Sequence, residues 1–176
     1  SLGKVVIKDS IWNFGAILIS KIGALAFTII LARFLMPESF GIYNLAMSVA
    51  LILITFSDLG INFTMIRYIS SALAKKNETK AKYYFKHLLK IRTILTIILS
   101  LLLLVLAYPL SYYFFKKPLL FYPLLISGVY IFVLSFENFF LANFYIINKV
   151  NYVAIKEIIT QTLRLTLIVL VFVFLS

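Results

Sequence analysis

Long runs of apolar residues, separated by short polar connections, make up most of the chain. A helix that crosses the hydrocarbon core of a membrane needs about 20 predominantly apolar residues. Runs of this length predict helices rather than the strands of an outer-membrane barrel, which alternate over segments of about ten residues. The pattern therefore predicts an all-α, polytopic transmembrane helical bundle with about five spans, near residues 12–35, 41–69, 91–114, 119–147 and 152–175.

Turn-forming residues separate several of the predicted spans. Pro37 follows the first span and Gly41 opens the second, while Pro118 precedes the fourth span and Asn148 follows it. Because these three connections are short, the helices that they join are predicted to be antiparallel neighbours. The longest polar stretch is the connection over residues 70–90.

Composition narrows the class of protein. Of the 176 residues, 63% are hydrophobic and 13% are charged, whereas an ordinary globular domain has about 45–50% and about 25%. A soluble domain of this size could not bury that much apolar surface, which disfavours a soluble enzyme, a nucleic-acid-binding protein and a secreted disulfide scaffold. Cysteine is absent and His87 is the single histidine, so we predict no metal site and no cofactor.

The net charge of +11 comes largely from one connection. Lysine and arginine are enriched in the cytoplasmic loops of membrane proteins. We therefore predict that this connection and the N-terminus, which carries Lys4 and Lys8, are cytoplasmic. Anionic lipids of the inner leaflet, rather than nucleic acid, are the expected partner of the basic excess. Between positions 67 and 92 the basic residues are Arg67, Lys75, Lys76, Lys80, Lys82, Lys86, Lys90 and Arg92, against the single acid Glu78.

The polar connection over residues 70–90 has the pattern of a basic amphipathic helix. Ala81, Tyr84, Phe85 and Leu88 recur on one face, while lysines repeat every four residues on another. Helices of this kind lie along a membrane surface, so we expect a topology anchor there. Docking of a lipid pyrophosphate headgroup on the same lysines is the alternative.

Four ionisable residues lie deep within four different predicted spans: Lys21, Asp58, Glu137 and Arg164. At about 1.5 Å per residue, each is about 13–18 Å from the predicted inner end of its span, near the middle of a core about 30 Å thick. A charge at that depth costs about 2.5–3.5 kcal/mol on the insertion scale, and such charges mark functional sites. The uncharged Asn138 and Gln161 lie at similar depth.

Two interpretations of these charges remain open, and they are not exclusive. In the first, Lys21 pairs with Asp58 and Glu137 pairs with Arg164, which lowers the insertion cost and fixes the helix register. In the second, the cations line a hydrated central cavity and hold an anionic or polar substrate.

The first 70 residues resemble a known family. The sequence ARFLMPESFGIY at residues 32–43 resembles the first hairpin of polysaccharide-biosynthesis membrane proteins, the O-antigen-type oligosaccharide flippases of the multidrug/oligosaccharidyl-lipid/polysaccharide exporter superfamily. The family pattern continues with the tripeptide Asp-Leu-Gly and then the dipeptide Arg-Tyr, which stand here at residues 58–60 and 67–68. Residues 9–13 also look like the family's entry into its first helix.

The resemblance implies a transporter that flips polyprenyl-pyrophosphate-linked oligosaccharide across the cytoplasmic membrane by alternating access. Members usually have two lobes of six helices with the substrate between them. This chain ends after five predicted spans, so we expect most of one N-terminal lobe, with the C-terminal lobe as its missing partner. In this interpretation, Lys21 and Arg164 bind the pyrophosphate, Asn13, Asn138 and Gln161 bind hydroxyl groups, and Asp58 and Glu137 are counter-ions or couple an ion.

Two other functions remain as alternatives. A cation-coupled multidrug exporter of the same superfamily would depend more on the acids than on the cations. A membrane-embedded enzyme of the same glycan pathway usually needs a large outward loop with catalytic residues, and both predicted outward loops are only a few residues long. We therefore expect a transporter and not an enzyme.

The charge asymmetry yields a prediction about orientation. In the variant Asn77→Cys, the introduced thiol should react with a membrane-impermeant reagent only after the cells are permeabilised, because residue 77 lies in the predicted cytoplasmic connection. Lys117→Cys, in a predicted outward connection, is the matched control and should react in intact cells. Labelling of the Asn77→Cys variant in intact cells would reverse the predicted orientation.

Overall fold

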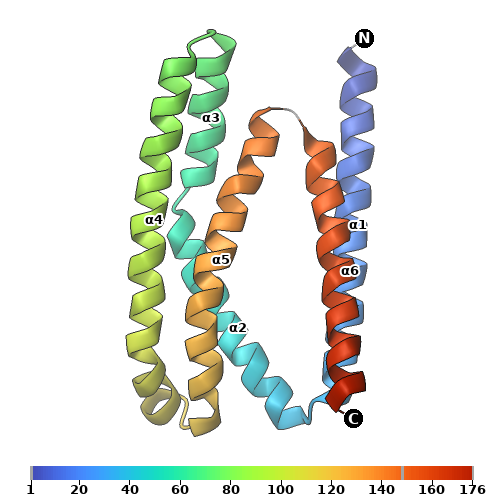
Figure 1. The fold of residues 1–176 in the computed structure, drawn as a ribbon, viewed down its shortest axis with the longest axis vertical. Coiled ribbons are helices and arrows are strands. Elements are labelled where there is room, and N and C mark those ends of the chain that lie inside the picture. The colour runs from blue at the N-terminus through green and yellow to red at the C-terminus, as the bar shows by residue number, and fades with distance from the viewer. Residues whose placement is uncertain (1, 148, 176) are drawn as a thin grey trace. The chain divides into compact units, whose positions relative to one another are not determined.

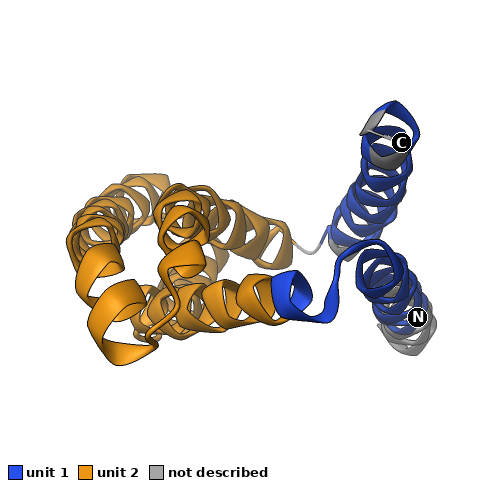
Figure 2. Cartoon of the chain, turned by 90° about the horizontal axis from the view of Figure 1, so that it is seen from below, with its two compact units in different colours: residues 1–40, 148–176 blue, residues 41–147 orange. Residues whose placement is uncertain are grey.

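The computed structural model describes the backbone of residues 2–147 and 149–175, and the side chains from residue 14 onward except residues 16, 148, 150, 172, 175 and 176. Within this described part the chain is helical and contains no strand, so the predicted all-α fold class is confirmed. The chain divides into two compact units, which are described separately (Figure 2). The terminal unit comprises residues 1–40 and 148–176, and the central unit comprises residues 41–147.

The terminal unit is built from α1 (Leu2–Phe34) and α6 (Val150–Leu175), which pack side by side (Figure 1). Both helices run in the same direction, as expected for two spans that each start from the same side of a membrane (Figure 1). A Cβ atom at Gly23 would lie 3.0 Å from Cβ of Gln161. The missing side chain therefore allows the two helices to approach closely at this point.

The central unit contains most of α2 (Pro37–Asp58), followed by α3 (Ile61–Ala74) and α4 (Glu78–Pro109). A π-helical turn, η1 (Leu110–Phe114), and a 3-10 turn, η2 (Pro118–Leu120), lead into α5 (Phe121–Ile146). Local sequence explains several helix ends. Pro37 is the first residue of α2, where its missing N–H costs nothing. Asn77 caps α4, because its side-chain oxygen accepts a hydrogen bond from the backbone N–H of Lys80 at 3.0 Å.

The second predicted span, over residues 41–69, is not one helix. It is broken between α2 and α3, where Leu59 has φ 40° and Gly60 has φ 79°. Two successive residues in the left-handed region cannot continue a right-handed helix. Glycine has no Cβ and adopts this conformation without strain, which explains why the break falls beside Gly60.

Residues 70–90 also differ from the expected surface helix. α3 runs to Ala74, a turn over residues 75–77 follows, and α4 begins at Glu78 and continues without interruption to Pro109. The basic residues therefore lie mainly in the turn itself, at Lys75 and Lys76, and along the first part of α4, and none lies in the last turn of α3. The 32 residues of α4 extend about 48 Å. This exceeds a hydrocarbon core of about 30 Å, so the lysine-rich end of α4 has the length to emerge from it.

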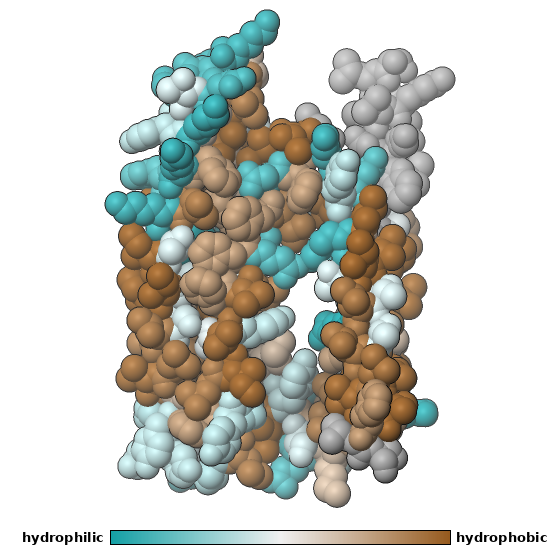
Figure 3. All heavy atoms as spheres, in the orientation of Figure 1, coloured by the Kyte–Doolittle hydropathy of each residue, from teal (hydrophilic) through white to brown (hydrophobic). Residues whose placement is uncertain are grey.

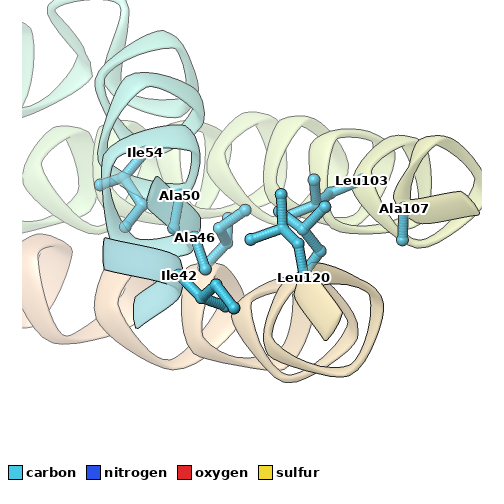
Figure 4. Packing of buried hydrophobic residues seen from close by; sticks show 9 residues of the cluster. Ile42, Ala46, Ala50, Ile54, Leu103, Ala107 and Leu120 are labelled. Atoms are coloured by element: carbon cyan, nitrogen blue, oxygen red, sulfur yellow. The ribbon is translucent and has the colours of Figure 1, made fainter. Parts of the chain in front are cut away.

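Two apolar clusters form the core of the central unit. In the first, Ala46 and Ala50 of α2 are 2% and 0% exposed and face Leu103 of α4 and Leu120 (Figure 4). These two small side chains of α2 are thereby buried in the cluster, as is common for alanine in membrane-helix interfaces. The second cluster joins α3, α4 and α5 around Met65 and the fully buried ring of Phe139.

Four helical stretches within the described residues are long and apolar enough to cross a membrane: Ile17–Phe34, Pro37–Ala74, Glu78–Phe114 and Pro118–Ile146. They overlap the first four predicted spans. α6 covers the fifth predicted span and has 26 residues. Hydrophilic residues cover the α3–α4 turn, whereas the helices below that turn are mainly apolar on the visible face (Figure 3).

The helix break predicts that replacing glycine by alanine has opposite effects on stability at Gly60 and at Gly41. Gly60→Ala should destabilise the protein by about 1–2 kcal/mol, because a Cβ is strained at a positive φ. Gly41→Ala is the control, since Gly41 lies in α2 with no other atom within 4 Å of the added Cβ, and it should stabilise by about 0.5–1 kcal/mol. Both can be measured as shifts in thermal unfolding in detergent. Equal shifts at the two positions would contradict the role given to Gly60.

Candidate functional site

Arg92 of α4 is the central residue of a buried polar cluster in the central unit. Its side chain is 0% exposed. Its Nη1 donates to Oδ1 of Asp58 at 2.7 Å and to the backbone carbonyl of Ser57 at 2.9 Å. Its Nη2 donates to the backbone carbonyl of Ser135 at 3.0 Å. One guanidinium therefore joins the end of α2 to α5.

A pair of serines completes this cluster. The Oγ atoms of Ser57 and Ser135 are 2.7 Å apart, and both side chains are fully buried. Ser57 also lies within hydrogen-bonding distance of the carbonyl oxygen of Ile54, at 2.8 Å. Polar pairs of this kind link transmembrane helices where water is absent. The cluster thus fixes α2, α4 and α5 to one another beside the break at residues 59–60.

The cluster gives Asp58 a partner that the sequence does not predict. One interpretation of the sequence pairs Asp58 with Lys21, and the structure shows an ion pair with Arg92 of the same unit. From the sequence, Arg92 is placed among the basic residues of the predicted cytoplasmic connection. The position of Arg92 in the sequence indicates instead that it faces the protein interior. It lies four residues after Leu88, on the apolar helix face that Ala81 and Leu88 define. A charge on the buried face of a helix requires a partner inside the fold.

Some polar atoms near Arg92 are not satisfied. Nε of Arg92 and Oγ1 of Thr96, one turn further along α4, are buried without a hydrogen-bond partner among the described residues. A buried donor or acceptor without a partner costs about 1–3 kcal/mol. The two terminal nitrogens of the guanidinium therefore have hydrogen-bond partners, whereas Nε of Arg92 and Oγ1 of Thr96 have none among the described residues.

A second polar cluster lies between α1 and α6 in the terminal unit. Oε1 of Glu157 accepts hydrogen bonds from Oγ of Ser20 at 2.6 Å and from Nε2 of Gln161 at 3.1 Å. Nζ of Lys156 lies 3.5 Å from Oε2 of the same carboxylate. Gln161 is 7% exposed, and its Oε1 has no partner within the described part of the chain. This cluster contains a predicted site residue, Gln161, together with Ser20, which the sequence did not indicate.

The two predicted cations of the terminal unit have different surroundings. The guanidinium carbon of Arg164 lies 3.8 Å from the ring centroid of Phe27, and the side chain is half-buried. This cation–π contact positions the charge without neutralising it. Lys21 is exposed, and its ammonium group has no ion pair with any described residue. Both cations therefore keep their charge free of a described carboxylate in this unit.

The remaining predicted residues are placed as follows. Glu137 and Asn138 lie on α5 of the central unit, and both are partly buried. Asn13 belongs to α1, but its side chain lies outside the described residues. The terminal unit thus brings Gln161 close to Glu157 and holds Arg164 against Phe27. The central unit contains Asp58, Glu137 and Asn138. Within the described residues no group of three or more metal-ligating side chains is found.

These features define the class of protein. Several long apolar helices, with charged side chains paired or packed at their interfaces, define a helical multi-pass membrane protein. The chain belongs to the family described as "Polysaccharide biosynthesis protein", whose model matches residues 6–176. No curated protein and no solved structure is significantly similar to it. The family predicted from the motif at residues 32–43 is confirmed, and the match extends far beyond that motif.

The Arg92 cluster predicts a large effect on stability. Arg92→Met should destabilise the protein by about 3 kcal/mol or more, because it leaves the carboxylate of Asp58 without its partner. The double variant Arg92→Met with Asp58→Asn should recover part of this loss, because no unpaired charge remains. Arg67→Met, an exposed arginine of α3, is the matched control and should change stability little. Thermal unfolding in detergent measures all three, and a double variant no more stable than Arg92→Met would argue against the pair.

Proposed function

We propose that the protein flips polyprenyl-pyrophosphate-linked oligosaccharide from the cytoplasmic to the outer leaflet of the cell membrane. The family supports a role in polysaccharide biosynthesis, and the membrane-spanning helices suit a transporter. The observation that carries the proposal is the pair of cations in the terminal unit, Lys21 and Arg164, whose charges are not bound by any described carboxylate.

The chemistry of the substrate matches these residues. A lipid-linked glycan carries an anionic pyrophosphate and many hydroxyl groups. An ammonium at Lys21 and a guanidinium at Arg164 would bind the phosphate oxygens, since charge-assisted hydrogen bonds are the strongest polar contacts available. The amides of Asn13, Asn138 and Gln161 would bind sugar hydroxyls. Gln161 has a buried acceptor, Oε1, with no partner among the described residues.

The acids have a different role in this proposal. Asp58 is the counter-ion of Arg92 at 2.7 Å and is therefore engaged in the fold. This favours a structural role over the coupling of a transported cation, so a cation-coupled multidrug exporter is the weaker alternative. Glu137 remains the candidate for coupling an ion or for a second counter-ion role. The mechanism is transport by alternating access rather than an enzymatic reaction, and it uses no cofactor.

The proposed orientation places the N-terminus and the α3–α4 turn in the cytoplasm. The lysines of that turn would lie against the anionic inner leaflet. The resemblance implies transport between two opposing lobes, and we propose that this lobe is one of them.

The role of Lys21 is tested in the full-length protein. Lys21→Ala should abolish transport while leaving membrane insertion and abundance unchanged, because the lysine has no described ion-pair partner whose charge would be stranded. Lys21→Arg should retain part of the activity, because it keeps the charge but changes its geometry. The measurement is restoration of surface polysaccharide in a host that lacks its own flippase.

The control for this experiment is Lys117→Ala, which removes an exposed lysine outside the long helices. It should transport like the unmodified protein. Full activity of Lys21→Ala would remove Lys21 from the substrate site. A loss of abundance that parallels the loss of transport would instead assign it a structural role.

A further inference from the structure

An open groove lies in the central unit, where α3 and α5 end and α4 begins. Its volume is about 260 Å³, and its wall is mainly apolar, formed by Ile69 and Leu73 of α3, Phe85 of α4 and Ile146 of α5. Sites for complete small molecules usually have about 300–1,000 Å³. The groove is therefore of a size to hold part of a larger molecule, and it is too small to seat a helix about 10 Å across.

Two lysines supply the charge at this groove. Lys82 and Lys86, one turn apart on α4, line it together with the apolar side chains. Lys82 has an ion pair with Glu78 at 3.8 Å, in which both side chains are more than three-quarters exposed. Such an exposed pair contributes little, so Lys82 remains available to another anion. A fitting ligand must therefore combine an apolar chain with an adjacent negative charge.

The groove lies at the level where polar sequence gives way to apolar sequence. The lysine repeat of α4 ends at Lys90, and the apolar run begins at Ile91. The same transition is visible on the surface, where hydrophilic residues cover the α3–α4 turn above a mainly apolar region (Figure 3). Phospholipid headgroups occupy this level in a membrane, with acyl chains directly beneath them.

We propose that this groove binds one phospholipid with an anionic headgroup, with an acyl chain against Leu73, Phe85 and Ile146 and the phosphate on Lys82 and Lys86. The amide nitrogen of Asn143, which also lines the groove, donates to the backbone carbonyls of Phe139 and Phe140 at 3.3 Å each. The amide oxygen of Asn143 is thereby left to accept, which suits a headgroup bearing hydroxyls, such as glycerol. This site uses the proposed membrane level of the α3–α4 turn but not the identity of the transported substrate.

The test is a lipid titration of the full-length protein in detergent, read by native mass spectrometry. Dioleoyl phosphatidylglycerol should bind as one retained molecule and more tightly than dioleoyl phosphatidylcholine. The double variant Lys82→Gln with Lys86→Gln should weaken phosphatidylglycerol binding by about tenfold or more. Lys80→Gln with Lys90→Gln is the matched control: it removes the same charge from the same helix, at positions that do not line the groove, and should change binding less than about threefold.

A second variant tests the apolar part of the site. Leu73→Trp places a larger side chain in the groove from a residue that is 40% exposed. It should fold normally, as judged by thermal unfolding and size-exclusion chromatography, and should lose the retained lipid. Glu78→Gln should strengthen binding slightly, because it releases Lys82.

Three results would overturn the site. The first is equal binding of the two lipids by the unmodified protein. The second is equal weakening by the two double variants, which would mean that only the overall basic charge attracts the lipid. The third is undiminished binding in folded Leu73→Trp. Because binding in detergent requires neither transport nor a fixed orientation, these outcomes are independent of the Lys21 experiment.

Discussion

The buried guanidinium of Arg92 is the interaction on which the central unit depends. Removing an ion from water costs several kcal/mol, even after the surroundings relax. Arginine stays charged under all ordinary conditions, so the fold must supply acceptors for it. They come from the end of α2, through Asp58 and the carbonyl of Ser57, and from the carbonyl of Ser135 in α5. One side chain therefore links three helices.

The helix break beside this cluster follows from the same constraint. Inside a membrane, a backbone that leaves the helical path must find other hydrogen-bond partners within the protein. At the end of α2 the backbone carbonyl oxygen of Ser57 accepts a hydrogen bond from Nη1 of Arg92. Gly60 provides the left-handed residue that the turn requires. The sequence Asp58-Leu59-Gly60 thus combines a counter-ion and a turn in three adjacent positions.

These observations show which features the sequence could predict. The long apolar runs could only be membrane-spanning helices, and the motif at residues 32–43 was sufficient to identify the family. Hydropathy could not reveal the break after Asp58. Leu59 and Gly60 are apolar or neutral, so they do not interrupt the apolar run, and the break is visible only in their positive φ angles. Nor could hydropathy assign Arg92 as the partner of Asp58, because the two residues are 34 positions apart and only the folded central unit brings them together.

A charged side chain can bind a substrate only if its charge is not already neutralised by an ion-pair partner in the fold. Arg92 and Asp58 are mutually satisfied, and a ligand that competed for either would leave the other buried and unpaired. Lys21 and Arg164 carry no such penalty, because one is exposed and the other rests on an aromatic ring, which does not neutralise it. A negatively charged ligand therefore gains more from the terminal unit than from the central cluster. The position of a charged residue deep within a predicted span suggests a functional role. Whether that residue is available to bind a ligand depends on the partners that it already has in the fold.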